Sequence, residues 1–299
     1  MPELPEVETV VRGLVRSIAG RTISAVRIGK SDFIDDPAEL ERQLPGRRIA
    51  RVERFGKFIS LAVAQAHDGA VSGRLFVHLG MTGRLIPRRP EDPVAPHTHV
   101  YFAFEDGGEL RYTDARRFGR MVFLQEPQAA AFIAKLGIEP LEISESDFVV
   151  RLGSRSARIK ALLLDQGVLR GMGNIYADES LWRSRIHPAR LGANLSSKQL
   201  RTLYATVRKV LQAAIQLRGS SISDFLDSEG NPGEYQTRHR VYGRAGKPCP
   251  RCRTLIRRSV VAGRGSYFCP RCQPPPREGK KRPAIRRPGK KSKARPRRA

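Results

Sequence analysis

The sequence has few cysteines, one tryptophan and no long hydrophobic run. Its four cysteines all lie between positions 249 and 272 of the 299 residues. The absence of an apolar stretch of about 20 residues excludes a membrane-spanning helix, and no signal peptide is recognisable. We therefore expect a soluble protein of the cytosol. In that reducing compartment, clustered cysteines are more typical of a metal site than of disulfide bonds.

Acidic residues are scarce relative to basic ones. The chain has 29 Asp and Glu against 55 Lys and Arg, which gives a net charge of +26 and an isoelectric point near 11.0. Residues 273–299 carry +11 of this charge, so residues 1–272 keep +15. An excess of this size and sign indicates a polyanionic partner, and nucleic acid is the first candidate.

Hydrophobic patterning predicts an α+β protein with several parts. Short strands with turn signals between residues 22 and 124 predict a β-sandwich or barrel, with a helix packed on it that begins directly after the N-terminus. Helical spacing dominates after residue 146. The expected organisation is a β-sandwich domain (1–125), a connector (126–145), a helical domain (146–243), a metal-binding module (244–273) and a disordered basic tail (274–299).

The first residues place a nucleophilic amine beside carboxylates. Pro2 is small enough for Met1 to be removed, which would leave a secondary amine at the N-terminus, and Glu3, Glu6 and Glu8 follow. An α-amino group titrates near roughly pH 8, so its unprotonated form can attack an electrophilic carbon and form an iminium, while a carboxylic acid moves the protons. The alternative on these residues alone is a helix that starts early and is capped by acids.

The cysteines form two C-x-x-C pairs separated by sixteen residues, and they are Cys249, Cys252, Cys269 and Cys272. This spacing predicts one tetrahedral Zn²⁺ with four thiolate ligands, which is a structural rather than a catalytic site. The metal would stabilise a β-hairpin that is too small to fold alone. Arg264 lies between two glycines in that hairpin, and it is either a solvated loop charge or an arginine that contacts DNA.

A glycine-rich segment, residues 170–175, links two predicted helices. Its backbone N–H groups at a helix N-terminus form an anion site, and Asn174 can cap the helix and donate its amide to a phosphate. A simple capping turn is the alternative. Lys57 is predicted at a hairpin tip, where lysine is usually exposed.

Three further side chains are candidates for insertion between bases. Met81, Arg116 and Phe118 lie in turns between strands, and apolar or planar side chains of this kind can enter a base stack. Core or surface packing is the alternative for each of them.

Taken together, seven motifs between residues 2 and 273 resemble, in order, the formamidopyrimidine-DNA glycosylase family and its endonuclease VIII-type relatives. They are Pro2-Glu3-Leu4-Pro5-Glu6-Val7-Glu8-Thr9, Gly56-Lys57-Phe58, His78-Leu79-Gly80-Met81-Thr82-Gly83, Tyr112-Thr113-Asp114-Ala115-Arg116-Arg117-Phe118-Gly119, Gly173-Asn174-Ile175-Tyr176-Ala177 (the helix-two-turn-helix of the family), Val241-Tyr242-Gly243-Arg244 and the four-cysteine zinc finger. Leu4 and the residues around it are similar to the purine-directed branch.

The resemblance implies a bifunctional enzyme of base-excision repair. Pro2 would attack C1′ of the damaged nucleotide and displace the base, giving a Schiff base, and Glu3 would act as the acid and base that helps to open the sugar. Successive β- and δ-eliminations would then cut the strand. The implied substrates are 8-oxoguanine and formamidopyrimidines in double-stranded DNA, which the protein would meet as a monomer in the bacterial cytosol or nucleoid. One structural Zn²⁺ is the only implied cofactor.

The resemblance also assigns DNA contacts. Lys57, Asn174 and Arg264 would hold the phosphates around the flipped nucleotide, and Glu6 would shape the pocket. The side chains expected to fill the gap in the duplex or to contact DNA nearby are Met81, His97, Arg116 and Phe118.

Two other interpretations stay open on the sequence. Residues 229–240 are more polar than is usual in the family, and they lie near the region that recognises the base, so an enzyme for oxidised pyrimidines is one alternative. A zinc protein that only binds damaged DNA is the other, although the retention of Pro2 and Glu3 argues against it.

Overall fold

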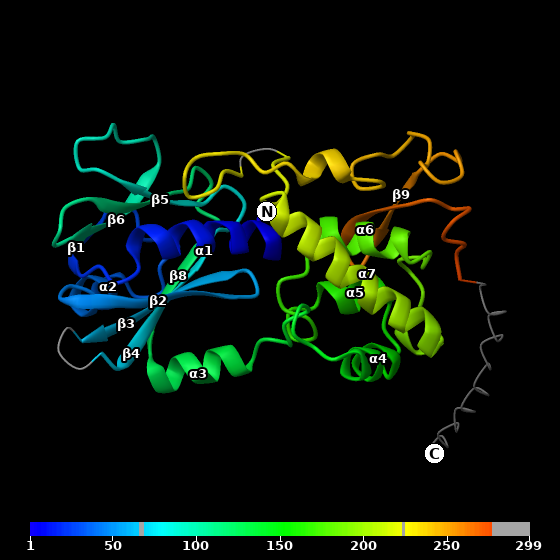
Figure 1. Cartoon of the computed structure of the whole chain (residues 1–299), viewed down its shortest axis with the longest axis horizontal. Helices are drawn as coiled ribbons and strands as arrows, with labels where there is room; N and C mark the ends of the chain where they lie inside the picture. The colour runs from blue at the N-terminus through cyan, green and yellow to red at the C-terminus, as the bar shows by residue number, and fades with distance from the viewer. Residues whose placement is uncertain (66–68, 223–224, 277–299) are drawn as a thin grey trace, which may run out of the picture.

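Two four-stranded antiparallel sheets form one lobe of the molecule, here called the sandwich lobe (Figure 1). The structure is a computed structural model that describes residues 1–65, 69–222 and 225–276. The expected tail lies outside the described residues from position 277 onward. One sheet has the order β1 (Ile23–Ile28), β6 (Thr98–Phe104), β7 (Glu109–Thr113) and β5 (Arg84–Arg88). The other has the order β2 (Arg47–Phe55), β3 (Phe58–Gln65), β4 (Val71–His78) and β8 (Arg120–Gln125). The predicted β-sandwich is confirmed.

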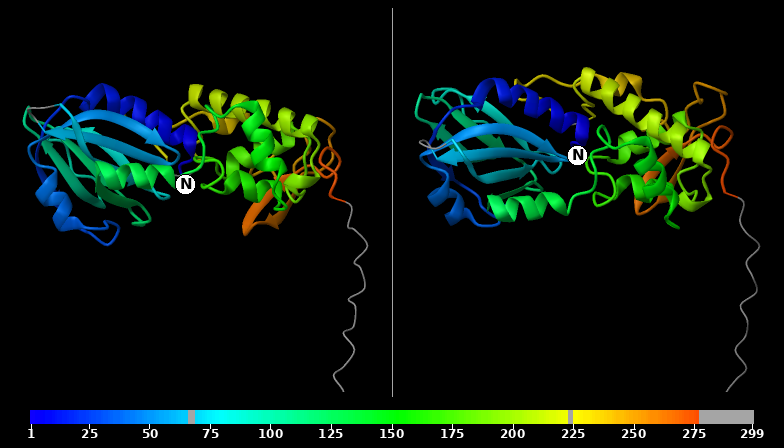
Figure 2. Two further views of the ribbon diagram at one scale, coloured as in Figure 1. Left: turned by 90° about the horizontal axis from the view of Figure 1, so that it is seen from below. Right: turned by 60° about the horizontal axis from the view of Figure 1, so that its bottom comes forward.

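Helix α1 (Leu4–Ile18) joins this lobe to the rest of the chain. Pro5 stands in its first turn, where a missing N–H costs no hydrogen bond. Its apolar stripe, which includes Val7 and Leu14, is buried in the same core as both sheets. Leu4, in contrast, belongs to the core of the helices that follow. The start of α1 therefore lies where the two halves of the molecule meet, as the position of the N-terminus shows (Figure 2).

Four helices and a short hairpin of the described residues form the second part, the helical lobe. They are α4 (Glu145–Gly153), α5 (Ile159–Leu164), α6 (Asn174–Arg183) and α7 (Ser197–Gln216), followed by β9 (Arg257–Val261) and β10 (Arg264–Phe268). Helix α7 begins with a capping box between Ser196 and Gln199 and buries the apolar stripe expected from its sequence. The described residues also form the short helices α2 (Pro37–Gln43), η1 (Gly192–Asn194) and η2 (Tyr235–Arg238). None of the helices within the described ranges is long and apolar enough to cross a membrane.

The connector differs from the expectation because it contains a helix, α3 (Glu126–Ala134). The side chain of Phe132 in α3 packs on the sandwich lobe. Its ring centroid lies 4.7 Å from that of Phe76 and 5.3 Å from that of Phe58. The sequence of α3 carries no marked apolar face, so its periodicity gave no helix signal and this packing is what fixes it.

A buried group of charges braces the connector between the two lobes. The carboxylate of Glu139 accepts from Arg54 at 3.0 and 3.1 Å and from Arg170 at 3.3 Å. Arg54 also pairs with Glu8 of α1 at 2.8 Å. Removing one member of this largely buried network would leave a charge without its partner, so these contacts stabilise the connector against α1, β2 and the segment before α6.

Candidate active site

The carboxylate of Glu3 is buried at the junction of the two lobes, where it accepts hydrogen bonds from the first turn of α6. Its oxygens accept from the backbone N–H groups of Ile175 at 3.0 Å and Tyr176 at 3.4 Å. Gly173, the N-cap residue, permits this approach, because a Cβ atom there would lie 2.1 Å from the carboxyl carbon of Glu3. The expectation that Asn174 caps this helix is therefore wrong, and Glu3 occupies the anion site formed by the N–H groups of Ile175 and Tyr176.

Lys57 is buried beside Glu3, rather than exposed as a hairpin-tip lysine usually is. Lys57 is only 8% exposed. The preceding Gly56 has a positive φ, and its backbone packs closely against Arg170 and Gly171. Burial lowers the pKa of Lys57, and the nearby charge of Arg264 lowers it further, while Glu3 opposes both. Burial in turn raises the pKa of Glu3, against the stabilising charge of Lys57 and the two backbone donors. A base and an acid with perturbed pKa values thus share one site.

Pro2 opens onto a small pocket at the start of α1, here called the Pro2 pocket. The residues that line it are Met1, Pro2, Glu6, Met81, Ile175, Ser220, Ile222 and Phe225. Pro2 is buried, whereas Met1 is 47% exposed at the mouth and accessible to removal. Burial, together with the charge of Glu3, raises the pKa of Glu6 to about 7.

The hairpin β9–β10 is held against the same junction. Asn174 donates from Nδ2 to the carbonyl of Gly265 at 3.0 Å, and Lys160 donates from Nζ to the same oxygen at 3.1 Å. Lys160 also pairs with Asp178 at 2.7 Å, and both side chains are fully buried. Arg264 follows Gly263, which has a positive φ, and its charge is near enough to depress the pKa of Lys57. These contacts bring Arg264 to Lys57 and Glu3 from more than 200 residues away in the sequence.

Met81, Arg116 and Phe118 project from the sandwich lobe instead of packing in its core. Met81 is 40% and Phe118 56% exposed, and the Arg116 guanidinium lies 4.5 Å from the centre of the Phe118 ring. Asp114 connects the two turns that carry them, since the hydroxyl of Thr82 donates to its carboxylate. None of the three residues is therefore part of the core of the sandwich lobe.

The backbone around Asp114 also positions His97. The N–H of Asp114 donates to the carbonyl of His97 at 3.0 Å, and the N–H of Gly119 donates to the Asp114 carboxylate at 2.8 Å. His97 itself has a φ of 64°, and its ring centroid lies 6.4 Å from that of His99. His97 is therefore next to the loop of Arg116 and Phe118, on the sandwich lobe.

The four cysteines converge on one point at the end of the hairpin. One Sγ atom from each lies within 4.8 Å of all the others, and Cys249 and Cys269 are fully buried. Zn–S bonds of about 2.3 Å place tetrahedral thiolates roughly 3.8 Å apart, so this donor set fits a zinc ion. Gln273 fixes the module to the helical lobe by donating to the carbonyl of Ile186 at 2.8 Å.

Comparison with known proteins matches the chain to three models in sequence order. These are the formamidopyrimidine-DNA glycosylase N-terminal domain over residues 1–121, the H2TH domain of the same glycosylase over residues 136–226, and the zinc finger found in FPG and IleRS over residues 246–275. The formamidopyrimidine-DNA glycosylase of Solibacter usitatus is 46% identical over 276 residues, which is 91% of this chain and 99% of that protein. The chain belongs to the formamidopyrimidine-DNA glycosylase family.

Solved structures of this glycosylase family agree with the fold. The Lactococcus lactis Fpg in complex with DNA containing an abasic site superposes with a TM-score of 0.83 at 34% identity, covering 91% of this chain and all of that one. The formamidopyrimidine-DNA glycosylase of Symbiobacterium thermophilum is 41% identical in sequence, and the alignment covers 97% of this chain and 95% of that protein. The present protein is accordingly a DNA glycosylase of this family with one structural zinc.

Two residues of this glycosylase site carried no signal in the sequence. Lys160 and Asp178 form a buried ion pair, and Lys160 also donates to the carbonyl of Gly265, 105 residues further along the chain. Their spacing matches no motif that would distinguish them from ordinary surface charges. A charged residue inside an apolar run, as in Ile159-Lys160-Ala161-Leu162, is the one hint that the sequence offered.

Loss of the zinc site will weaken DNA binding and metal content together. We expect Cys249→Ser to lose the zinc ion and to bind duplex DNA at least about 10-fold more weakly, because the hairpin that carries Arg264 has too small a core to fold alone. Zinc would be measured by atomic emission and affinity by fluorescence anisotropy. Val260→Ser, an exposed change on β9, is the control. Full affinity in a zinc-free Cys249→Ser protein would show that the finger does not contact DNA.

Proposed function

We propose that this protein removes oxidised purines, namely 8-oxoguanine and formamidopyrimidines, from double-stranded DNA and then cuts the strand at the abasic site. The observation that carries the proposal is the junction of Pro2, Glu3 and Lys57, three residues whose burial and charges suit covalent catalysis by an amine. The Lactococcus lactis relatives bind DNA that contains Fapy-dG or an abasic site, which supports this substrate class. We also propose that the protein acts as a monomer on chromosomal DNA in the bacterial cytosol.

The chemistry begins when Met1 is removed and Pro2 becomes a secondary amine. Its nitrogen attacks C1′, the bond from C1′ to the base breaks, and the electron pair leaves with the base. The Pro2 nitrogen then loses its proton to solvent, and the bond from C1′ to the ring oxygen of the sugar breaks as the iminium forms. Glu3, whose pKa is raised by burial, donates a proton to that oxygen. The iminium acidifies the hydrogens on C2′, so β-elimination and then δ-elimination release the sugar from both phosphates.

DNA is proposed to lie across the junction of the two lobes, with the damaged nucleotide turned out of the stack. Lys57, Asn174 and Arg264 hold its phosphates. The gap in the duplex is filled by Met81, Arg116 and Phe118, with His97 as a neighbouring contact. Turning a nucleotide out costs a few kcal/mol, which these contacts must offset.

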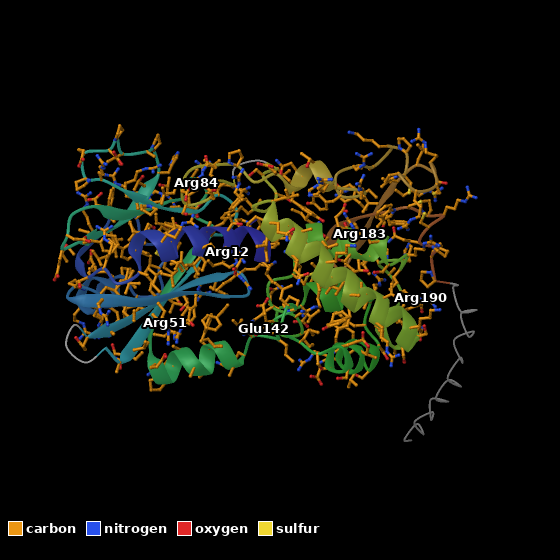
Figure 3. All side chains as sticks on the ribbon, viewed as in Figure 1. Arg12, Arg51, Arg84, Glu142, Arg183 and Arg190 are labelled. Carbon is orange, nitrogen blue, oxygen red and sulfur yellow. The ribbon has the colours of Figure 1, made fainter. Side chains whose placement is uncertain are left out.

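The net charge of +15 carried by residues 1–272 supports binding to DNA, and basic side chains are found on both lobes. Arg12, Arg51 and Arg84 lie on the sandwich lobe, whereas Arg183 and Arg190 lie on the helical lobe (Figure 3). Of these five, Arg12, Arg51 and Arg183 pair with Glu8, Glu53 and Glu179, so the attraction comes from the net charge, and the affinity that it gives falls steeply with salt.

A second candidate is activity on oxidised pyrimidines. It is favoured by a Lactococcus lactis relative that has been solved with DNA containing an oxidised pyrimidine. A panel of duplexes with 8-oxoguanine, a formamidopyrimidine or thymine glycol separates the two. Faster excision of thymine glycol than of 8-oxoguanine would reverse the proposed preference.

Trapping with borohydride tests the enzyme proposal itself. The purified protein, with Met1 removed, is mixed with an abasic duplex and sodium borohydride, and we expect a covalent complex that mass spectrometry assigns to Pro2. Duplex binding without any covalent complex would instead favour a protein that only recognises damaged DNA.

A further inference from the structure

The polar segment that departs from the family pattern, residues 229–240, reaches the Pro2 pocket through the side chain of His239. The Nε2 atom of His239 lies 3.1 Å from the hydroxyl of Ser220. Ser220 lines the Pro2 pocket together with Glu6. The segment therefore connects the outside of the helical lobe with the pocket wall.

A continuous chain of hydrogen bonds runs from His239 to Glu6, and it is here called the relay. After His239 and Ser220 comes the hydroxyl of Tyr176, 3.3 Å from that of Ser220. Tyr176 is hydrogen-bonded in turn to Oε1 of Glu6. The members between the two ends are buried, so water does not compete for their hydrogen bonds.

Both ends of the relay are held firmly. Glu6 accepts from the backbone N–H of Ser220 at 2.6 Å and from that of Glu3 at 2.9 Å. At the other end, the buried Glu179 accepts from three consecutive backbone N–H groups directly after His239, at 2.8, 2.9 and 3.0 Å. The geometry is thus fixed by contacts that do not involve the His239 ring.

The surroundings of the two ends raise the pKa of Glu6 and lower that of His239. Burial and Glu3 raise the pKa of Glu6 to about 7, while its hydrogen bonds from Tyr176, Ser220 and Glu3 lower it, and the positive charge of Lys57 lies nearby. Burial lowers the pKa of His239, with α6 presenting Glu179, which raises it, and Arg183, which lowers it. The rings of Tyr235 and Tyr242 enclose the other sides of the imidazole, with centroids 5.8 and 5.7 Å away.

The hydroxyl groups of the relay can point in one of two directions. When Glu6 is protonated, it donates to Tyr176, Tyr176 donates to Ser220, and Ser220 donates to Nε2 of His239. When Glu6 is ionised, the hydroxyls turn round and Tyr176 donates to the carboxylate. The first direction requires an acceptor at position 239, and a neutral histidine supplies it.

We propose that His239 keeps a proton on Glu6 by accepting the last hydrogen bond of the relay, so that Glu6 can protonate the departing base. The inference rests on the proposed function and adds a positioning residue to it. When the bond from C1′ breaks, the base leaves with the electron pair and takes one proton from Glu6. Glu6 is left ionised, the hydroxyls of Tyr176 and Ser220 turn towards it, and a proton from solvent returns to Glu6 after the base has left the Pro2 pocket.

Two variants at position 239 separate this role from simple packing. His239→Leu removes the acceptor, whereas His239→Gln places an amide oxygen near the position of Nε2 and cannot titrate. We expect His239→Leu to lower the pKa of Glu6 by roughly one unit, because the protonated form loses the stabilisation of one hydrogen bond. We expect His239→Gln to keep the pKa of Glu6 near the wild-type value. The measurement is a ¹³C NMR titration of the Glu6 carboxyl carbon in the full chain, assigned with Glu6→Gln.

Kinetics gives a second readout. With a shift of that size from a pKa of about 7, the single-turnover rate of base release in His239→Leu falls below wild type by about 2-fold at pH 6 and about 10-fold at pH 8. Cleavage of a preformed abasic duplex, from which no base departs, stays within about 2-fold at both pH values. Thr237→Val, an exposed change in the same segment, serves as the matched control.

The outcomes are distinct. Ser220→Ala should reproduce the effect of His239→Leu, and the double variant should add nothing, because both changes interrupt the same relay. Equal behaviour of His239→Leu and His239→Gln, or additive effects in the double variant, would overturn the inference. If the wild-type protein released no base, the proposed function would be overturned. If the enzyme were active but the pKa of Glu6 were unchanged in His239→Leu, only the role of the relay would be overturned.

Discussion

Pro2→Gly will lose borohydride trapping on an abasic duplex and will release damaged bases roughly 10³-fold or more slowly than wild type. The reason is that glycine replaces the secondary amine of the proline ring by a flexible primary amine, which no longer has the fixed geometry that proline gives at the start of α1. Pro5 and the burial of Leu4 fix that start, and Pro2 is held against the Pro2 pocket. Losses of this order are usual when a covalent nucleophile is replaced.

The same variant should bind DNA almost as tightly as wild type. Pro2 carries no side-chain charge, and the basic residues on both lobes are unchanged, so anisotropy with an abasic-site analogue should report a dissociation constant within about 3-fold. An equal loss of trapping and of affinity would contradict the role assigned to Pro2, because it would indicate that the replacement disturbs the DNA site as a whole.

Glu3→Gln and Glu3→Ala will separate the catalytic role of this carboxylate from its structural one. Both should slow base release by roughly 10²- to 10⁴-fold, which is the usual contribution of a positioned acid or base. Their effects on folding differ. In wild type, Glu3 accepts from the N–H groups of Ile175 and Tyr176. Alanine leaves both donors buried without a partner, at a cost of about 2–4 kcal/mol, whereas glutamine keeps one acceptor and costs about half as much.

Urea unfolding and single-turnover kinetics on the same preparations measure the two roles of Glu3. Glu41→Gln is the control, since Glu41 is an exposed glutamate on α2 of the same lobe and does not line the Pro2 pocket. If Glu3→Gln kept wild-type base release while Glu3→Ala were merely unstable, Glu3 would be a helix cap and nothing more.

The largest parts of the fold followed from local patterns in the sequence. Short alternating strands separated by turn residues specified the sandwich, because a strand that is half buried must alternate in polarity. The stripe of α7 and the cysteine spacing were equally direct, since each depends on residues close together in the chain. The helix α3 had no such pattern, and its packing through Phe132 could not be read from its own residues.

The site itself shows the same division between local and distant information. The sequence by itself determined which residues are chemically able to act: an early proline beside a glutamate, an arginine between glycines, and four thiols at zinc spacing. Only the tertiary structure decided that Glu3 rather than Asn174 closes α6, that Lys57 is buried, and that His239 reaches Glu6. The physical reason is that a pKa, a buried ion pair and a hydrogen-bond relay depend on burial and on distances between residues remote in the chain, which no local pattern encodes.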